Sequence, residues 1–163
     1  MTNATMPIRV ALLAVCLVSF YWIPAGTTSA ARPLRLLAGF DQSRGVIETS
    51  RGICLLLDLY LADTPRQQAQ GLMYVEELGE FEGMLFRYSK SARLTMWMKN
   101  TYIALDMLFI RGGGSIAGIV RDTEPLSTRR INSPDAVSGV LEVNAGFADR
   151  WDIQPGNRLL TIN

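Results

Sequence analysis

Apolar residues occupy every second position over residues 53–61, which is the clearest strand pattern in the chain. The alternating positions are Leu55, Leu57, Leu59 and Leu61. A period of two residues is typical of a β-strand with one buried face, so we expect these leucines to point into a core. Shorter apolar segments predict further strands at residues 46–49, 84–86, 94–98, 104–110, 115–121, 139–143 and 158–162.

Two short helices are predicted in the connections between these strands. Thr64 can cap the first helix, Gln67 completes a capping box with it, and Gly71 suits its C-terminal end. The second helix is predicted over residues 145–151, with Asn144 as its N-cap.

The balance of elements predicts a mainly β (α+β) fold: a compact β-barrel or sandwich of about seven or eight short strands with two short helices in the connections. A parallel α/β fold needs a helix after almost every strand, and the sequence lacks these helices. Residues 125–136 are polar and contain two prolines, so we expect a long surface loop there.

The N-terminal segment has the order of a secretion signal. Arg9 precedes an apolar run over residues 10–22, and small residues follow up to Ala30 and Ala31, after either of which cleavage is expected. The run is too short for a stable membrane-spanning helix, which needs about 20 residues. We therefore expect a cleaved signal over 1–30, a lead-in over 31–45 and one β-rich domain over 46–163. The predicted location is the periplasm or the extracellular space, and the alternative is an uncleaved N-terminal anchor.

Composition limits the chemistry that the domain can perform. The chain contains no His, which excludes Ser-His and Cys-His nucleophile pairs and His-ligated zinc. Lys and Arg number 16 against 15 Asp and Glu, and this near-neutral balance disfavours a nucleic-acid partner. We predict no metal and no cofactor. Removal of the signal leaves Cys54 as the single cysteine, and its apolar surroundings in the sequence predict that it is buried.

Several methionines fall in the predicted core segments: Met73, Met84, Met96, Met98 and Met107. Thioethers are soft ligands that suit Cu(I), so a copper site is one interpretation. The other is that these side chains fill gaps in the core, which is the more common role of Met.

The first group of candidate site residues follows Met96 at the end of a predicted strand. Trp97, Lys99 and Asn100 would stand at a rim, where Lys99 and Asn100 supply hydrogen-bond donors to an anionic or hydroxylated ligand. Asp106 would be an acceptor or a general base nearby. The alternative is that Asn100 lies in a turn that Asp106 orients by hydrogen bonds.

The second group is Glu142 and Asn144, which are two apart on a predicted strand and would share a face. Apolar neighbours suggest that the Glu142 carboxyl group is held near the interior, where it needs a partner such as Lys99 or an arginine. Asn144 is either a helix cap or a ligand contact. Asp106 and Glu142 could also form a pair of hydrolase carboxylates.

A set of ordered motifs resembles the domain of unknown function 192 family. The motifs are Leu61-Ala62-Asp63-Thr64-Pro65, Gln70-Gly71-Leu72-Met73, Glu82-Gly83-Met84-Leu85-Phe86, Met96-Trp97-Met98-Lys99-Asn100-Thr101, Leu105-Asp106-Met107-Leu108-Phe109-Ile110 and Leu141-Glu142-Val143-Asn144-Ala145-Gly146. The resemblance implies a compact, mainly β domain, often behind a signal or a single anchor, with no established activity. It also implies Lys99, Asn100, Asp106, Glu142 and Asn144 as the shared polar positions, while Ala104 stands where relatives usually have Pro.

Two functions follow as hypotheses. The first is a non-catalytic ligand-binding or accessory module of the cell envelope, with Trp97 and other aromatic residues suited to a sugar-like or peptide ligand. The alternative is a carboxylate-dependent hydrolase that acts on envelope saccharide or peptide material through Asp106 or Glu142. In a third interpretation, these polar residues only brace the fold.

Overall fold

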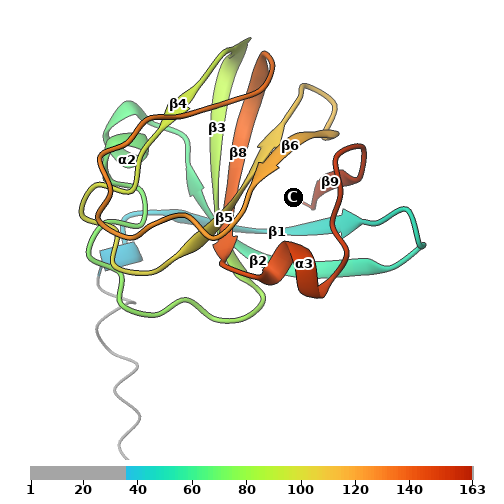
Figure 1. The fold of residues 1–163 in the computed structure, drawn as a ribbon, viewed down its shortest axis with the longest axis horizontal. Helices are drawn as coiled ribbons and strands as arrows, with labels where there is room; N and C mark the ends of the chain where they lie inside the picture. Colours follow the sequence, from blue (N-terminus) through green and yellow to red (C-terminus); the bar gives the residue numbers. More distant parts are fainter. Residues whose placement is uncertain (1–35, 163) are drawn as a thin grey trace, which may run out of the picture.

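The structure, a computed structural model, describes residues 36–162 (Figure 1). The predicted signal and its cleavage site lie outside these residues. The strands are β1 (Asp41–Glu48), β2 (Cys54–Ala62), β3 (Glu82–Ala92), β4 (Thr95–Met96), β5 (Leu105–Ile110), β6 (Ile116–Val120), β7 (Ile131–Asn132), β8 (Val137–Asn144) and β9 (Arg158–Ile162). The helices are α2 (Pro65–Gln70) and α3 (Phe147–Arg150). The prediction of a mainly β fold with two short helices in its connections is confirmed.

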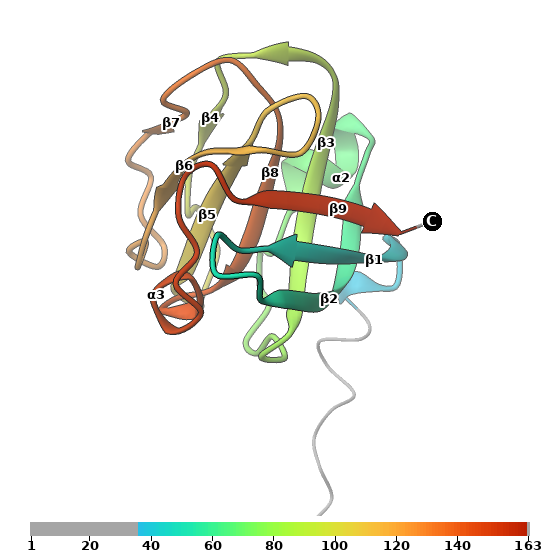
Figure 2. The ribbon, with the colours of Figure 1, turned by 90° about the vertical axis from the view of Figure 1, so that its right-hand side faces the viewer.

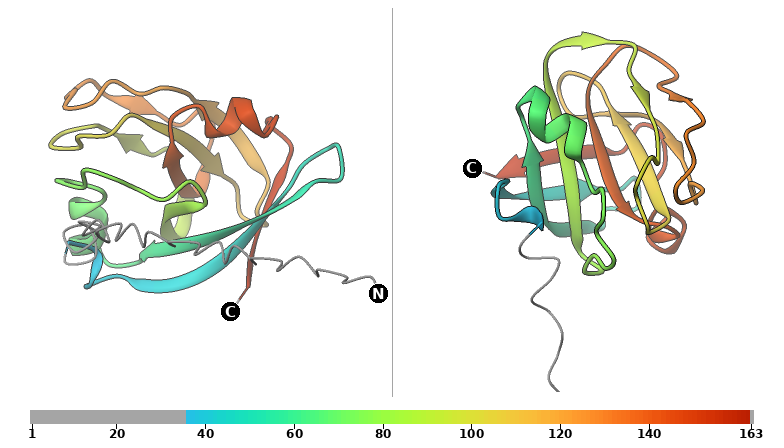
Figure 3. Two further views of the ribbon diagram at one scale, coloured as in Figure 1. Left: turned by 90° about the horizontal axis from the view of Figure 1, so that it is seen from below. Right: turned by 90° about the vertical axis from the view of Figure 1, so that its left-hand side faces the viewer.

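Seven strands form one curled sheet in the order β6-β5-β8-β3-β2-β1-β9, and β4 pairs with β7 in a small second sheet. Figure 2 shows β9, β1 and β2 side by side, and the left panel of Figure 3 shows the curl. The curl brings the two edge strands of the sheet, β6 and β9, together. A hydrogen bond marks this contact: the amide of Leu159 donates to the carbonyl oxygen of Gly114 at 2.8 Å. A Cβ atom at position 114 would lie only 2.3 Å from the carbonyl oxygen of Leu159, so this close approach of the two backbones requires glycine.

Each face of the curled sheet buries its own apolar core. The inner core lies within the curl and contains the leucines of the 53–61 pattern together with Leu108, Leu141 and Phe147. The outer core lies on the other face and contains Met84, Phe86, Met98, Met107 and Val140, among others. On this side, α2 and the segment that carries β4 cover the sheet (Figures 1 and 3). Burial on both faces accounts for the long apolar segments of β5 and β8.

The first helix forms as its sequence predicts. The Thr64 side chain accepts from the Gln67 amide, the Gln67 side chain bonds back to the cap, and Gly71 ends the helix with φ 49°. The helix connects β2 to β3, which run parallel. One β-α-β unit is therefore present, although the fold as a whole is not of the α/β class.

Several predicted boundaries change in the structure. Strand β1 begins at Asp41, within the predicted lead-in, because its early residues pair with the end of β2. Helix α3 is shorter than predicted and begins after Gly146, not after Asn144. The predicted loop at 125–136 contains β7, which gains its partner from β4.

The prediction that Cys54 is buried is wrong, because the thiol is exposed. Cys54 shares the outward face of β2 with Leu56 and Asp58, while the odd-numbered leucines point inward. Among residues 36–162, no helix has the length and apolar character to cross a membrane.

Candidate functional site

Glu142 lies in the middle of β8, opposite Met84 of β3 and Met107 of β5. Its side chain belongs to the outer-core face and is only 4% exposed. Within residues 36–162 the carboxyl group makes no hydrogen bond or ion pair. Burial in this apolar layer raises the pKa of Glu142 to about 8, because the charged form loses its hydration without gaining a partner. At neutral pH the group is therefore mainly an uncharged acid.

The Glu142 carboxyl group lines a recess of about 30 Å³, which we call the Glu142 recess. One wall is formed by α2 and the residues that follow it, up to Met73, and the other by the segment 96–101. A water molecule needs roughly 10–15 Å³ of such space. The recess is thus large enough for about two water molecules, or for a chemical group of two to three heavy atoms.

A second buried polar residue, Thr101, lines the same recess. Across the described part of the chain its hydroxyl group has no hydrogen-bond partner. The side chains of Gln68 and Gln70 also line the recess but are held in place by the backbone. Their amide nitrogens donate to the carbonyl oxygens of Arg87 at 2.8 Å and Leu36 at 3.0 Å, respectively. The recess thus combines fixed walls with two polar groups that lack partners.

Trp97 and Lys99 line the recess and are both exposed, so we call their part of it the mouth. The Trp97 side chain is 52% exposed, and the Lys99 ammonium nitrogen lies 6.0 Å from the centre of its ring. The structure therefore brings together three of the residues selected from the sequence: Trp97, Lys99 and Glu142. It does not show Lys99 paired with Glu142, which was one of the partners expected for the buried carboxyl group.

Asn100 shapes the mouth but does not line the recess. Its side chain donates to the Tyr74 hydroxyl group at 3.0 Å, and its carbonyl oxygen accepts from the Tyr74 amide at 2.8 Å. Asn100 and Tyr74 both have positive φ, and so does Leu126, whose amide donates to the carbonyl oxygen of Thr101. Backbone strain of this kind costs of order 1–3 kcal/mol per residue and concentrates at functional sites. The strain here surrounds the segment that forms the mouth.

Asp106 lies on the opposite face of the sheet from Glu142. It is paired with Val143, so the alternation of side chains directs it toward the inner core. One carboxyl oxygen accepts from the Asp122 amide and the other from the Ala148 amide, both at 2.9 Å. Asp106 therefore braces the fold, as in the third interpretation, although its bonds go to Asp122 and Ala148 and not to the turn at Asn100. The structure does not bring Asp106 and Glu142 together as a catalytic pair.

Asn144 shares the face of Glu142, as predicted, but its side chain has a structural role. Its amide nitrogen donates to the carbonyl oxygens of Leu78 at 2.9 Å and Gly79 at 3.1 Å. These bonds tie the end of β8 to the loop before β3. Asn144 is neither a helix cap nor a residue that lines the recess.

Sequence reasoning missed Thr101, Gln68 and Gln70 as site residues. Thr101 and Gln70 belong to two of the motifs quoted for the family resemblance, and those motifs are far apart in the chain but adjacent in the structure. Their presence in these motifs was the signal in the sequence that could have identified Thr101 and Gln70 as site residues. The methionines at 73 and 96 also line the recess, while those at 84, 98 and 107 are buried in the outer core.

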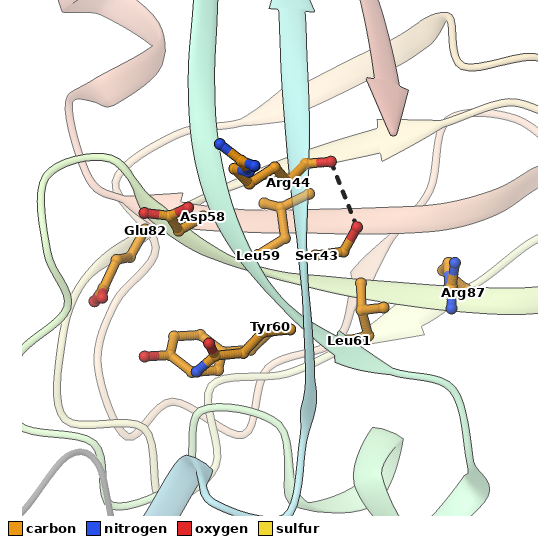
Figure 4. Close-up of a pocket in the computed structure, with 9 residues that line it drawn as sticks. Ser43, Arg44, Asp58, Leu59, Tyr60, Leu61, Glu82 and Arg87 are labelled. Carbon is orange, nitrogen blue, oxygen red and sulfur yellow. Dashed lines mark hydrogen bonds between the residues drawn. The ribbon is translucent and has the colours of Figure 1, made fainter. Parts of the chain in front are cut away.

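A larger cavity of about 580 Å³ lies over β1, β2 and β3 (Figure 4). Its lining includes Arg44, Asp58, Tyr60, Glu82 and Arg87. The pKa of Tyr60 is raised mainly by burial and, to a smaller extent, by the nearby Glu82 carboxylate. Its charges are balanced, and Arg87 is already paired with Asp63. None of the residues selected from the sequence lines this cavity. We place the candidate site in the smaller recess because buried polar groups without partners are costly, whereas exposed charges are not.

Comparison with known proteins places the chain in a family. A sequence model of the family described as "DUF192: Uncharacterized ACR, COG1430" matches residues 44–161. The chain belongs to the DUF192 family. A comparison with curated proteins gives no match. The match covers the curled sheet except for the first three residues of β1 and the last residue of β9, and it includes every site candidate.

Two solved structures resemble this DUF192 domain. One is a protein from Sinorhizobium meliloti 1021 described as a "putative transcription regulator", with 40% identity, a TM-score of 0.74, and coverage of 75% of this chain and 95% of that chain. The other is a protein of unknown function from Novosphingobium aromaticivorans DSM 12444, with 31% identity, a TM-score of 0.73, and coverage of 76% of this chain and 87% of that chain.

The ionisable groups of the domain are dispersed. Within the described range, no three side chains of His, Cys, Asp or Glu come close enough to hold a metal ion together. The chemistry available at the Glu142 recess is therefore that of one neutral acid, one hydroxyl group, one ammonium group and an aromatic ring.

Proposed function

We propose that this DUF192 domain is a ligand-binding module of the cell envelope that holds a small polar group of its ligand in the Glu142 recess. The observation that carries the proposal is that Glu142, which lines the recess, is buried and its carboxyl group lacks a partner in the described chain. A hydrogen bond to such a group contributes about 0.5–1.5 kcal/mol net of its exchange with water. A ligand group that pairs with it gains this energy, which favours binding.

The mouth of the recess supports the same proposal. Trp97 offers an exposed aromatic face against which a sugar ring or a peptide side chain can pack, and Lys99 offers a charge next to it. The ligand must extend beyond the recess, because a sugar ring is larger than two or three heavy atoms. Localisation to the envelope rests on the signal-like order of residues 1–30.

Binding can be measured by isothermal titration calorimetry, with Trp97 fluorescence as a local probe. The panel consists of peptidoglycan disaccharide-peptide fragments, neutral oligosaccharides and tripeptides. At least one class should bind, and Lys99→Ala and Glu142→Leu should each weaken its affinity by roughly tenfold or more.

Lys90→Ala provides the matched control. Lys90 is exposed on β3 and does not line the recess, so its removal changes the net charge equally and should leave affinity unchanged. The proposal fails if no class binds, or if Glu142→Leu and Lys99→Ala bind as the wild type does. Export is checked separately by the mass of the protein recovered from the periplasm, where retention of Arg9 would contradict cleavage.

One observation favours a hydrolase as the second candidate. A carboxyl group with a pKa of about 8 is protonated at neutral pH and can serve as a general acid. However, no second carboxylate among the described residues lines the recess. Product formation from the same panel, abolished by Glu142→Gln, would identify an enzyme, whereas binding without turnover would exclude this candidate.

A further inference from the structure

We propose that the ligand group held in the Glu142 recess is a carboxylate, bound between Lys99 at the mouth and the buried Glu142. This inference rests on the proposed binding function and names the chemical class of the ligand. The carboxylate can belong to a peptide C-terminus or to an acidic sugar, since the recess receives the same group from either.

Size is the first argument. The recess has room for two to three heavy atoms, and a carboxylate has three. A whole sugar ring or an aromatic side chain does not fit. The rest of the ligand would lie outside, against the exposed ring of Trp97.

Charge is the second argument. Among the described residues that line the recess, Lys99 and Glu142 are the only ones with ionisable side chains. Because Glu142 is mainly uncharged at neutral pH, the ammonium group of Lys99 gives the recess a net positive charge. An anionic group is attracted to such a site and a cationic group is repelled.

Hydrogen bonding is the third argument. The neutral Glu142 carboxyl group, the Thr101 hydroxyl group and the Lys99 ammonium group each carry a hydrogen that a carboxylate can accept. Bonds of this kind to an ionised acceptor are stronger than neutral ones. The amide nitrogen of Gln68 adds none, because the carbonyl oxygens of Ala62 and Arg87 take both of its hydrogens, whereas that of Gln70 is held by the Leu36 carbonyl oxygen through one.

The arrangement makes binding dependent on pH, because Glu142 donates a hydrogen only when it is protonated. Among the described residues, Lys99 on the segment 96–101 and Tyr88 on β3 also face it. Burial and the Glu142 charge raise the pKa of Tyr88. The residues of α2 that line the recess and the β5 neighbour Met107 are uncharged. Above pH 8 two carboxylates would face each other, and affinity should fall.

The test uses four probes titrated into the domain and followed by the ¹³C signal of the Glu142 carboxyl group and the indole signal of Trp97. The probes are N-acetyl-alanyl-alanine with its C-terminal amide, and glucuronate with glucose. At pH 6 each carboxylate should bind roughly tenfold more tightly than its uncharged counterpart. Above pH 8 its affinity should fall by roughly tenfold per pH unit.

Two variants and one control separate the contributions of Lys99 and Glu142. Lys99→Ala should abolish the preference for carboxylates, while Lys90→Ala should preserve it. Glu142→Gln retains a hydrogen-bond donor that does not titrate, so it should keep the preference but lose the decline above pH 8. The difference between the dipeptide and glucuronate identifies the source of the carboxylate.

The outcomes distinguish this inference from the proposed function. Binding of the uncharged probes that is equal to or tighter than that of the carboxylates would overturn the carboxylate while leaving a ligand-binding recess. If none of the probes, nor any member of the wider panel, perturbs either signal, both proposals are wrong.

Discussion

Asp106 and Glu142 lie on adjacent strands, yet the fold treats their carboxyl groups in opposite ways. Both side chains are buried. Two backbone amides hold the oxygens of Asp106, whereas the Glu142 group gains no such donor within residues 36–162. Desolvation without compensation favours the protonated form, which is why the pKa of Glu142 rises. A buried carboxyl group is thus a brace at one position and an uncharged hydrogen-bond donor at the other.

At the residue scale, this difference predicts a pH dependence of stability. The pKa of Glu142 is about 8 in the folded chain, against an ordinary value of 4.5. The folded state therefore binds the proton more tightly, and its stability falls as pH rises from about 4.5 toward 8, by about 1.4 kcal/mol per pH unit. Glu142→Gln should remove this contribution. Between pH 5 and pH 9 we expect the variant to gain on the order of 4 kcal/mol relative to the wild type.

Urea unfolding of both proteins at several pH values measures the difference. Other carboxylates titrate equally in the two chains, so the wild type minus the variant isolates Glu142. A difference that stays constant from pH 5 to pH 9 would show that the carboxyl group titrates as it does in the unfolded chain.

At the element scale, Asp106 joins three parts of the fold. From β5 it holds the turn at Asp122, which has a positive φ, and the amide of Ala148 in α3. The hydrogen bond from the Asp122 amide to Asp106 helps to stabilise the positive φ of Asp122, since this conformation is strained for a residue other than glycine.

Asp106→Ala should therefore lower the free energy of unfolding by about 2–5 kcal/mol, since two amides lose their acceptor. Lys99→Ala should change it by less than about 0.5 kcal/mol, because that side chain is exposed. Thermal and urea unfolding measured together check both values. A large loss in Lys99→Ala would show that Lys99 is part of the scaffold, and equal stability of Asp106→Ala and the wild type would contradict its role as a brace.

Sequence reasoning succeeded where a pattern depends on neighbours in the chain. The alternation of Leu55, Leu57 and Leu59 and the capping box of Thr64 are local, and both are confirmed. It failed where the partner is remote. Asn is a residue type that often caps helices, but the Asn144 side chain instead donates to the carbonyl oxygens of Leu78 and Gly79.

The candidate site shows the same division. Lys99 and Glu142 could be selected from their residue types, but the alternation that puts Asp106 on the other face follows only from the register of β5 against β8. Thr101 could not be assigned, since its hydroxyl group gains significance only from the recess that α2 encloses.

At the scale of the whole molecule, closure of the sheet depends on Gly114. The amide of Leu159 bonds to this residue, and the Ile116 amide bonds to the carbonyl oxygen of Asn157, so the edges of β6 and β9 meet there. A side chain at position 114 would collide with the backbone of Leu159 and would also be strained by the φ of 88°.

Gly114→Ala should therefore destabilise the domain by about 1–3 kcal/mol and increase hydrogen exchange of the Leu159 and Ile116 amides. Gly113→Ala is the matched control, because it also has a positive φ but has no atom within 4 Å of a Cβ position. If both variants lose the same stability, backbone strain and not edge contact accounts for the effect.

Two segments form the walls of the Glu142 recess: α2 with the turn after it, and residues 96–101. Their buried apolar side chains pack into the outer core. Neither stretch contributes a side chain to the inner core. Transplanting these two stretches from another family member would thus exchange the binding preference and leave the barrel interior as it is. Chimaeras that exchange these two segments are therefore a practical way to compare ligands among relatives.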